Sequence, residues 1–163
     1  MTSIATLGSH CALQVLKGAK DEGFKTVLIC EKKRERLYRR FKFIDEMVIV
    51  DSFVEITEKK CESALQENDS ILIPHGTLIS QMNSEQIESI KTPVFGNKYI
   101  LRWESDRMLK EQLMKEAKLN VPKSISNAKE ISNLVIAKRH GAAVGNGYFL
   151  ASTEQEYNKN RKQ

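Results

Sequence analysis

The chain has 163 residues, of which 40% are hydrophobic and 29% are charged, and its formal net charge is +5. No stretch approaches the roughly 18 consecutive apolar residues that a membrane-spanning helix needs, and no charged segment followed by an apolar one opens the chain. We therefore expect a cytoplasmic protein without a membrane partner, long enough for one domain or for one domain and part of a second.

The spacing of cysteine and histidine argues against a structural metal or a disulfide framework. The three cysteines lie far apart and form no C-x-x-C pair, which indicates a reducing compartment. The three histidines also lie far apart, without the H-E-x-x-H spacing of a zinc helix. We therefore expect no metal ligands among these residues.

The first strand and the turn that follows it form the strongest functional feature. A short apolar run over residues 3–7 leads into Gly8-Ser9-His10, and apolar residues at helical spacing come next. Such a turn lies at the carboxyl end of a strand, where open α/β sheets bind ligands, and it directs helix-start amides toward an anion such as a phosphate. His10 could donate to that phosphate or take a proton. Alternatively, Gly8 and Ser9 only make the turn and cap the helix.

A second turn of this kind follows the fourth predicted strand. Strands are predicted at residues 25–30, 47–50 and 70–74, and a helix at 54–66 starts at Asp51 and Ser52. The last of these strands runs into His75-Gly76-Thr77. If both strands lie near the point where the strand order reverses, His10 and Thr77 face one crevice. Alternatively, Pro74 ends an edge strand and the turn has no further role.

Much of the positive charge lies in one run, residues 32–42, in which basic side chains alternate with Tyr38 and Phe41. Such a run can bind nucleic acid, because Lys and Arg neutralise phosphates and aromatic rings stack on bases. It can also be a solvated face that lends one arginine to a small phosphorylated ligand. We favour the second interpretation, with no nucleic-acid partner, because no RNA- or DNA-binding motif accompanies the run.

The alternation of strands and helices ends near residue 119. A short helix at 85–90 and a short strand at 93–97 precede a helix that Ser105 caps and that runs to Leu119. An extended Val121-Pro122 segment follows. We place a domain boundary here, with one domain at 1–119 and another segment at 120–163.

The last segment predicts a hairpin with a glycine-rich loop, between strands at 134–138 and 148–151. Glycines let a backbone close over phosphates, and Lys138 would add an ammonium group there. Gly145 and Gly147 could instead serve only the turn. The loop matches neither a Walker loop nor G-x-G-x-x-G. A polar stretch from Glu154 onward begins a helix.

Three stretches in this order resemble one family. This family is the archaeal formate-dependent AICAR ligases, or FAICAR synthetases (PurP), of the ATP-grasp superfamily. The close resemblance lies in residues 6–10, in the segment 95–107 with its Arg-Trp-Glu-Ser motif, and in Val121-Pro122 followed by Lys138 and the glycine-rich hairpin. The resemblance covers nearly the whole chain. It implies an α/β fold: a Rossmann-like parallel sheet, the pre-ATP-grasp domain, followed by the first strands of an ATP-grasp domain.

The family resemblance implies the chemistry of a ligase in purine (IMP) biosynthesis. ATP phosphorylates formate to formyl phosphate, and the amine of the imidazole ribonucleotide AICAR attacks it to give FAICAR, ADP and phosphate. Positive groups and Mg²⁺ offset the charge on the transferred phosphoryl group. The residues implied are His10, Thr77, Gly8 and Ser9 for AICAR, with Thr77 in place of the usual serine, and Lys138, Gly141, Gly145 and Gly147 for ATP. Catalytic residues stay unidentified.

The sequence departs from the family pattern in two ways. The family loop reads Gly-Ala-Arg-Gly-Gly-Arg-Gly, whereas residues 141–147 read Gly-Ala-Ala-Val-Gly-Asn-Gly, without the two arginines. The family also continues for another domain, which carries the Mg²⁺-binding carboxylates. We therefore expect a C-terminally truncated chain that does not turn over alone. The alternative is a non-catalytic module that keeps the ribonucleotide site, or that serves only as a contact in a homo-oligomer.

Overall fold

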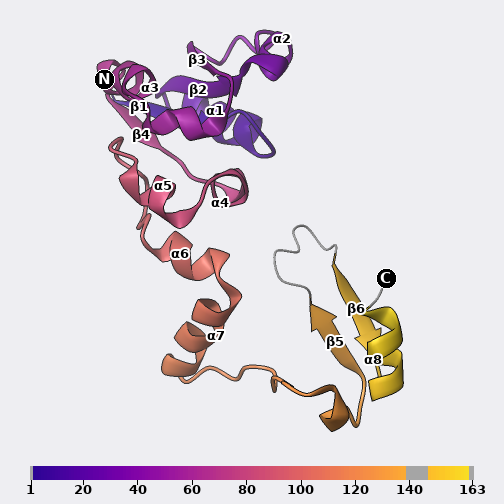
Figure 1. Ribbon diagram of the computed structural model, residues 1–163. Helices are drawn as coiled ribbons and strands as arrows, with labels where there is room; N and C mark the ends of the chain where they lie inside the picture. Colours follow the sequence, from indigo (N-terminus) through magenta and orange to yellow (C-terminus); the bar gives the residue numbers. More distant parts are fainter. Residues whose placement is uncertain (1, 139–146, 162–163) are drawn as a thin grey trace. The chain divides into compact units, whose positions relative to one another are not determined.

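The computed structural model describes residues 2–138 and 147–161. The chain forms two compact units, Met1–Leu113 and Met114–Gln163 (Figure 1). The domain boundary predicted after residue 119 stays a prediction. No helix in the described part of the chain is long and apolar enough to cross a membrane.

The first unit is built on a parallel sheet with the strand order β3-β2-β1-β4. Its strands are β1 (Ser3–Leu7), β2 (Lys25–Glu31), β3 (Glu46–Val50) and β4 (Ser70–Leu72). All neighbouring pairs are parallel, with Ser3 opposite both Lys25 and Ser70. A parallel bridge from Leu72 to Val94 adds a fifth extended segment beyond β4. The predicted α/β parallel sheet is confirmed, although β4 is two residues shorter than expected.

Helices cover both faces of this sheet, because side chains of the central strands alternate between two apolar clusters. Val27 and Ile29 join the cluster on one face, whereas Leu28 and Cys30 join the cluster on the other. The first cluster contains residues of four helices: η2 (Phe53–Thr57), α3 (Lys59–Glu67), α4 (Gly76–Gln81) and α5 (Ser84–Ser89). The second cluster contains residues of α1 (Ala12–Asp21) and α2 (Glu35–Tyr38). Helix α2 follows the short helix η1 (Lys32–Arg34). The result is a three-layer arrangement.

The helix predicted at 54–66 is two helices, and the single-helix prediction is wrong. Ser52 does start it, through a capping box with Glu55. The backbone is then extended at Glu58, between η2 and α3. In one continuous helix, Ile56 and Cys61 would point about 140° apart. The break lets both side chains reach the same core, where each is buried.

The helix predicted to start at Ser105 is also interrupted. Helix α6 (Ile100–Ser105) ends where that start was predicted, and α7 (Arg107–Glu116) follows. The cap is Asp106, whose Oδ1 accepts from the amides of Met108 at 2.8 Å and Leu109 at 3.2 Å. A carboxylate there satisfies helix-start amides, so the prediction of Ser105 as the cap is wrong. Instead, the Ser105 hydroxyl donates to the Arg102 carbonyl.

The second unit contains η3 (Ala128–Glu130), the hairpin strands β5 (Val135–Lys138) and β6 (Tyr148–Ala151), and α8 (Glu154–Asn160). The strands pair antiparallel, as expected for a hairpin. Helix α8 packs on the hairpin: the Phe149 and Tyr157 rings lie 5.5 Å apart, and Asn160 Nδ2 donates to the Leu150 carbonyl. Residues 139–146 of the predicted glycine-rich loop lie outside the described residues.

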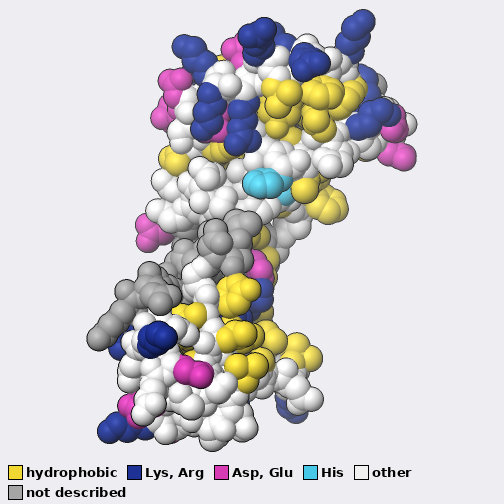
Figure 2. Space-filling model, turned by 90° about the vertical axis from the view of Figure 1, so that its right-hand side faces the viewer, with side chains coloured by type: hydrophobic (Ala, Val, Ile, Leu, Met, Phe, Trp, Pro, Cys, Tyr) yellow, Lys and Arg dark blue, Asp and Glu magenta, His cyan; other side chains and the backbone are white. Residues whose placement is uncertain are grey.

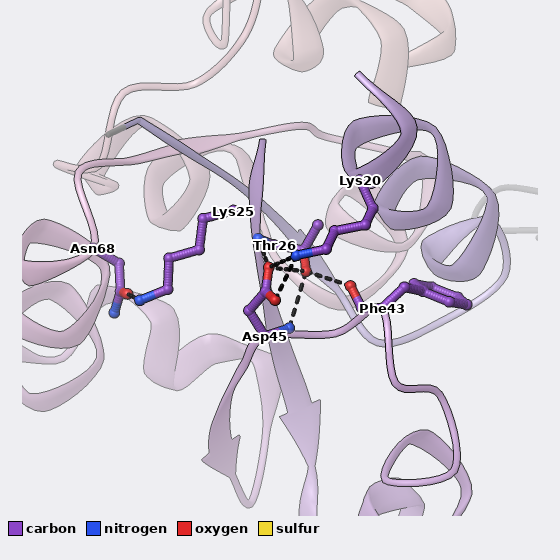
Figure 3. Close-up of polar contacts among 6 residues, drawn as sticks. All are labelled: Lys20, Lys25, Thr26, Phe43, Asp45 and Asn68. Atoms are coloured by element: carbon purple, nitrogen blue, oxygen red, sulfur yellow. Dashed lines mark hydrogen bonds and ion pairs between the residues drawn. The ribbon is translucent and has the colours of Figure 1, made fainter. Parts of the chain in front are cut away.

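At the amino edge of the parallel sheet, hydrogen bonds connect β2 to the segment before β3, and an ion pair connects α1 to the same segment (Figure 3). Asp45 Oδ2 accepts from the Thr26 amide at 2.8 Å, and Lys20 Nζ lies 2.6 Å from Asp45 Oδ1. The Thr26 hydroxyl, which is fully buried, donates to the Phe43 carbonyl at 2.6 Å. Burial raises the pKa of the Asp45 carboxyl, but the hydrogen bonds from Lys20 and Thr26 outweigh it, and the pKa is lowered.

Candidate functional site

The candidate site lies at the carboxyl edge of the sheet, where the strand order reverses. From β1 the chain continues through β2 and β3 on one side, and β4 joins β1 on the other. Ligands of open α/β sheets bind at such a switch point. β4 is the last named strand of the sheet, and its outer side is partly paired, because the amide of Leu72 donates to the Pro93 carbonyl and that of Phe95 donates to the Leu72 carbonyl. The strand order thus agrees with β4 as a terminal strand, and the role of the turn after Pro74 stays a prediction.

The turn after β1 is held against β2. The Gly8 amide donates to the Ile29 carbonyl at 2.7 Å, and the Ala12 amide donates to the Ser9 carbonyl. A Cβ atom on Gly8 would lie 3.1 Å from Tyr38 Cε2 and 3.2 Å from the Ile29 oxygen. Glycine suits this position because a side chain would have to push these two neighbours away by a few tenths of an ångström.

Three polar side chains meet where this turn approaches the turn after β4. His10 Nδ1 lies 3.0 Å from Ser9 Oγ and 3.3 Å from Thr77 Oγ1. Ser9 and Thr77 are buried, whereas His10 is exposed. No described residue hydrogen-bonds His10 Nε2. In the tautomer in which Nδ1 accepts a hydrogen bond from these hydroxyls, the ring proton lies on Nε2. Nε2 can then donate a hydrogen bond to a ligand oxygen. Figure 2 shows histidine exposed on the surface of the first unit.

His75 ties the same two turns together. Its Nε2 lies 3.0 Å from the Leu7 carbonyl oxygen, and its Nδ1 accepts from the Thr77 amide at 3.3 Å. A carbonyl can only accept, so the proton lies on Nε2. Both ring nitrogens are therefore used within the fold. The sequence drew attention to both histidines, but only the structure distinguishes His75 from His10, whose Nε2 has no hydrogen-bond partner among the described residues.

A third segment, after β2, also reaches the Gly8 turn. Arg34 Nη1 donates to the Gly8 carbonyl at 3.2 Å, and Arg34 Nε lies 3.7 Å from Glu31 Oε2. Burial raises the pKa of the Tyr38 phenol, and the nearby Arg34 guanidinium partly offsets the rise. We interpret the basic run as a solvated face that could lend one arginine to a small phosphorylated ligand, and that role stays a prediction. Arg34 is the arginine for which a hydrogen bond to the Gly8 turn is observed.

The residues expected to bind ATP lie in the second unit or outside the described part. Lys138 is exposed at the end of β5 and pairs with Tyr148 across the hairpin. Gly147 has a φ of +84°, a conformation that favours glycine. Gly141 and Gly145 lie outside the described residues. Among the residues that are described, no group of three or more His, Cys, Asp or Glu side chains could hold a metal ion.

The cysteines are all free thiols. Cys30 and Cys61 are buried, and burial raises the pKa of each thiol to about 11. Both stay protonated at neutral pH, so neither is a nucleophile. Cys11 is exposed beside His10 at the start of α1, where no side chain caps the helix.

Comparison with solved structures defines the class of protein. The chain has the fold with which ATP-grasp ligases begin: the Rossmann-like domain, followed by the first strands of the ATP-grasp domain. An "IMP biosynthesis protein PurP" from Thermococcus kodakaraensis aligns with a TM-score of 0.60 and 27% identity, over 87% of this chain and 41% of that one. N5-carboxyaminoimidazole synthetase from Staphylococcus aureus, complexed with ADP, aligns with a TM-score of 0.69 and 15% identity, over 99% and 43%.

Residues 4–125 match the family model described as "Protein of unknown function (DUF1246)", and the chain belongs to that family. A "5-formaminoimidazole-4-carboxamide-1-(beta)-D-ribofuranosyl 5'-monophosphate synthetase" of Nitrosopumilus maritimus is 66% identical over 100% of this chain and 48% of that protein. Its namesake from Methanocaldococcus jannaschii is 46% identical over 96% and 44%. The resemblance to PurP proteins is thus confirmed, and the chain spans about half the length of the curated relatives it matches.

Proposed function

We propose that this chain is the ribonucleotide-binding part of an ATP- and formate-dependent ligase that formylates AICAR to FAICAR in purine biosynthesis. The observation that carries the proposal is the contact of His10 Nδ1 with Ser9 Oγ and Thr77 Oγ1 at the switch point of the sheet. Such a cluster offers a nitrogen donor and hydroxyls to the phosphate or ribose oxygens of a nucleotide. The names of the relatives support this ligand.

The proposed reaction has two steps. A formate oxygen attacks the γ-phosphorus of ATP, so that formyl phosphate forms and ADP leaves. The AICAR amine then attacks the formyl carbon, phosphate leaves, and the amine nitrogen loses a proton. In this scheme Lys138 and the glycines of residues 141–147 bind the ATP phosphates. Mg²⁺ would offset the phosphate charge when bound, and we assign none of its ligands to the described residues.

For the 163-residue chain alone we propose AICAR binding without turnover. The segment 141–147 contains no arginine or lysine, so within it a triphosphate finds backbone amides and the Asn146 amide group, and the positive charge comes from the preceding residues Lys138 and Arg139. This composition also favours a second candidate function, a ribonucleotide-binding module without ATP chemistry. Both candidates predict AICAR binding. They differ in whether ATP binds as well.

A matched pair of variants tests the ribonucleotide site. Thr77→Ser keeps the hydroxyl near His10, whereas Thr77→Val keeps the shape and removes it. We expect calorimetry to show AICAR binding to wild type and Thr77→Ser, and about tenfold weaker binding to Thr77→Val. Absence of AICAR binding to the wild-type chain would refute the proposal. ATP titration separates the two candidate functions, and turnover with ATP, formate and AICAR would overturn the claim that the chain alone is inactive.

The remaining expectations concern partners and location. Within the basic run, Lys33 pairs with Glu31 and Arg39 pairs with Glu35, so part of its charge is neutralised inside the fold. We therefore propose small-molecule ligands and no nucleic-acid partner, in the cytoplasm where such nucleotides are made. Strongly salt-dependent binding of an oligonucleotide would contradict this. Light scattering would establish whether the chain forms a homo-oligomer.

A further inference from the structure

We propose that Arg34 binds the 5′-phosphate of the ribonucleotide, an inference that rests on the proposed function and specifies one of its subsites. Arg34 Nη1 donates to the Gly8 carbonyl at 3.2 Å, so the guanidinium lies against the turn that carries His10. A guanidinium has five N–H donors in a planar fork that matches a phosphate. The side chain also interacts with Glu31 and Tyr38, and it is 40% exposed, so part of it is open to a ligand in solvent.

The charge around Arg34 favours an anion. Glu31 at the end of β2 is 7% exposed and is approached by two cations, Lys33 at 2.8 Å and Arg34 at 3.7 Å. One carboxylate and two cations leave one positive charge uncompensated in this group. Lys33 has the shorter contact with Glu31 and is 67% exposed, so it mainly neutralises the carboxylate. Arg34 is the member of the group that also contacts the turn.

The position of Arg34 relative to the turn is fixed by packing. Tyr38, four residues further along, is buried, and its ring edge lies where a Gly8 side chain would be. The Gly8 amide is held by Ile29 at the same place. The segment that carries Arg34 and the turn that carries His10 therefore form one packed unit. An arginine held in this way loses little side-chain entropy when it binds a phosphate.

The test compares three ligands against two arginine variants of the full chain. Arg34→Gln removes the guanidinium that we propose to bind the phosphate. Arg39→Gln removes a more exposed arginine of the same run, which pairs with Glu35. The ligands are AICAR, its nucleoside without phosphate, and ribose 5-phosphate, titrated with detection by amide chemical shifts. We expect Arg34→Gln to lower the affinity for AICAR and for ribose 5-phosphate about 10- to 100-fold and to leave the affinity for the nucleoside unchanged. Arg39→Gln should change none of the three.

The conservative variant Arg34→Lys should recover part of the affinity for the phosphorylated ligands, because it keeps the charge and loses the fork. Equal weakening of AICAR and nucleoside by Arg34→Gln would mean that Arg34 only braces the Gly8 turn, and would overturn the proposal. Unchanged AICAR affinity would overturn it too, with the proposed function intact. If the wild-type chain binds ribose 5-phosphate through Arg34 but not AICAR, the phosphate subsite stands and the proposed function fails.

Discussion

The two edges of the parallel sheet are both polar, but they use their polar groups differently. At the amino edge, groups pair within the fold: Ser3 Oγ lies 2.8 Å from Ser70 Oγ, Lys25 Nζ donates to Asn68 Oδ1, and Asp45 accepts from Thr26 (Figure 3). At the carboxyl edge, His10 Nε2 has no partner among the described residues, and Arg34 is partly exposed. The polar groups of the amino edge are therefore used within the fold, whereas those of the carboxyl edge are partly exposed, at the place where we propose that a ligand binds.

This difference follows from the topology. At the carboxyl edge the chain leaves β1 and β4 toward opposite faces of the sheet, since α1 and α4 belong to different apolar clusters. Side chains of the two turns meet at this point, which is where open α/β sheets bind their ligands. The turns must nevertheless hold their shape, and the contacts of His75 with Leu7 and Thr77 join one turn to the other. Substitutions at the two edges should consequently change different measurements.

The largest effect on stability is expected for Asp45→Ala at the amino edge. The buried Thr26 loses the acceptor of its amide, and the nearby Lys20 loses its partner. We expect the free energy of unfolding in urea to fall by about 2–3 kcal/mol, with AICAR affinity unchanged. Asp21→Ala is the control, because it removes an exposed pair with Lys17 and should cost less than about 0.5 kcal/mol. Equal losses in the two variants would contradict this assignment.

Gly8→Ala should affect both stability and binding, because this glycine belongs to the packing and to the site. Its new methyl group would press on Tyr38 and on the Ile29 carbonyl. We expect a loss of about 1–2 kcal/mol in the free energy of unfolding, together with weaker AICAR binding. Gly18→Ala is the matched control, since nothing lies within 4 Å of a Cβ there. A Gly8→Ala protein with wild-type stability and affinity would show that the turn tolerates a side chain.

His10→Ala should weaken binding without weakening the fold. Among the described residues the exposed imidazole hydrogen-bonds only to Ser9 and Thr77, and its removal opens space through which water can reach these two buried hydroxyls. We expect AICAR affinity to fall about tenfold by calorimetry, with an unchanged unfolding midpoint. His75→Ala, by contrast, should lower both the AICAR affinity and the unfolding midpoint, because His75 bridges Leu7 and Thr77. If His10→Ala destabilises the protein as much as His75→Ala, the two histidines share a structural role.

The smallest effect is a pH dependence that belongs to the amino edge. The pKa of Asp45 is lowered below its ordinary value of 3.8 in the folded protein. Its contribution to stability is therefore fully present above that value and is lost as the pH falls through the folded pKa. Between about pH 5 and about pH 2, the wild type should lose more unfolding free energy than Asp45→Asn. Parallel pH profiles for the two proteins would contradict this.

Local patterns predicted most elements, because short apolar runs and turn residues act within a few positions. The strands at 3–7 and 25–30 and the hairpin of β5 and β6 follow such patterns. The errors occurred where local signals competed. Ser105 and Asp106 are both good helix caps, and only the backbone shows which one is used. The break at Glu58 depends on which side chains must reach a shared core.

By itself, the sequence determined that two strands end in small polar turns and that one basic run lies between them, because composition and spacing are local properties. Tertiary structure alone decided that Ser9, His10 and Thr77 meet, since residues 67 positions apart come together only through the pairing of β1 with β4. It also brought Arg34 of the basic run to the Gly8 carbonyl, because this contact depends on how the segment after β2 packs on the turn.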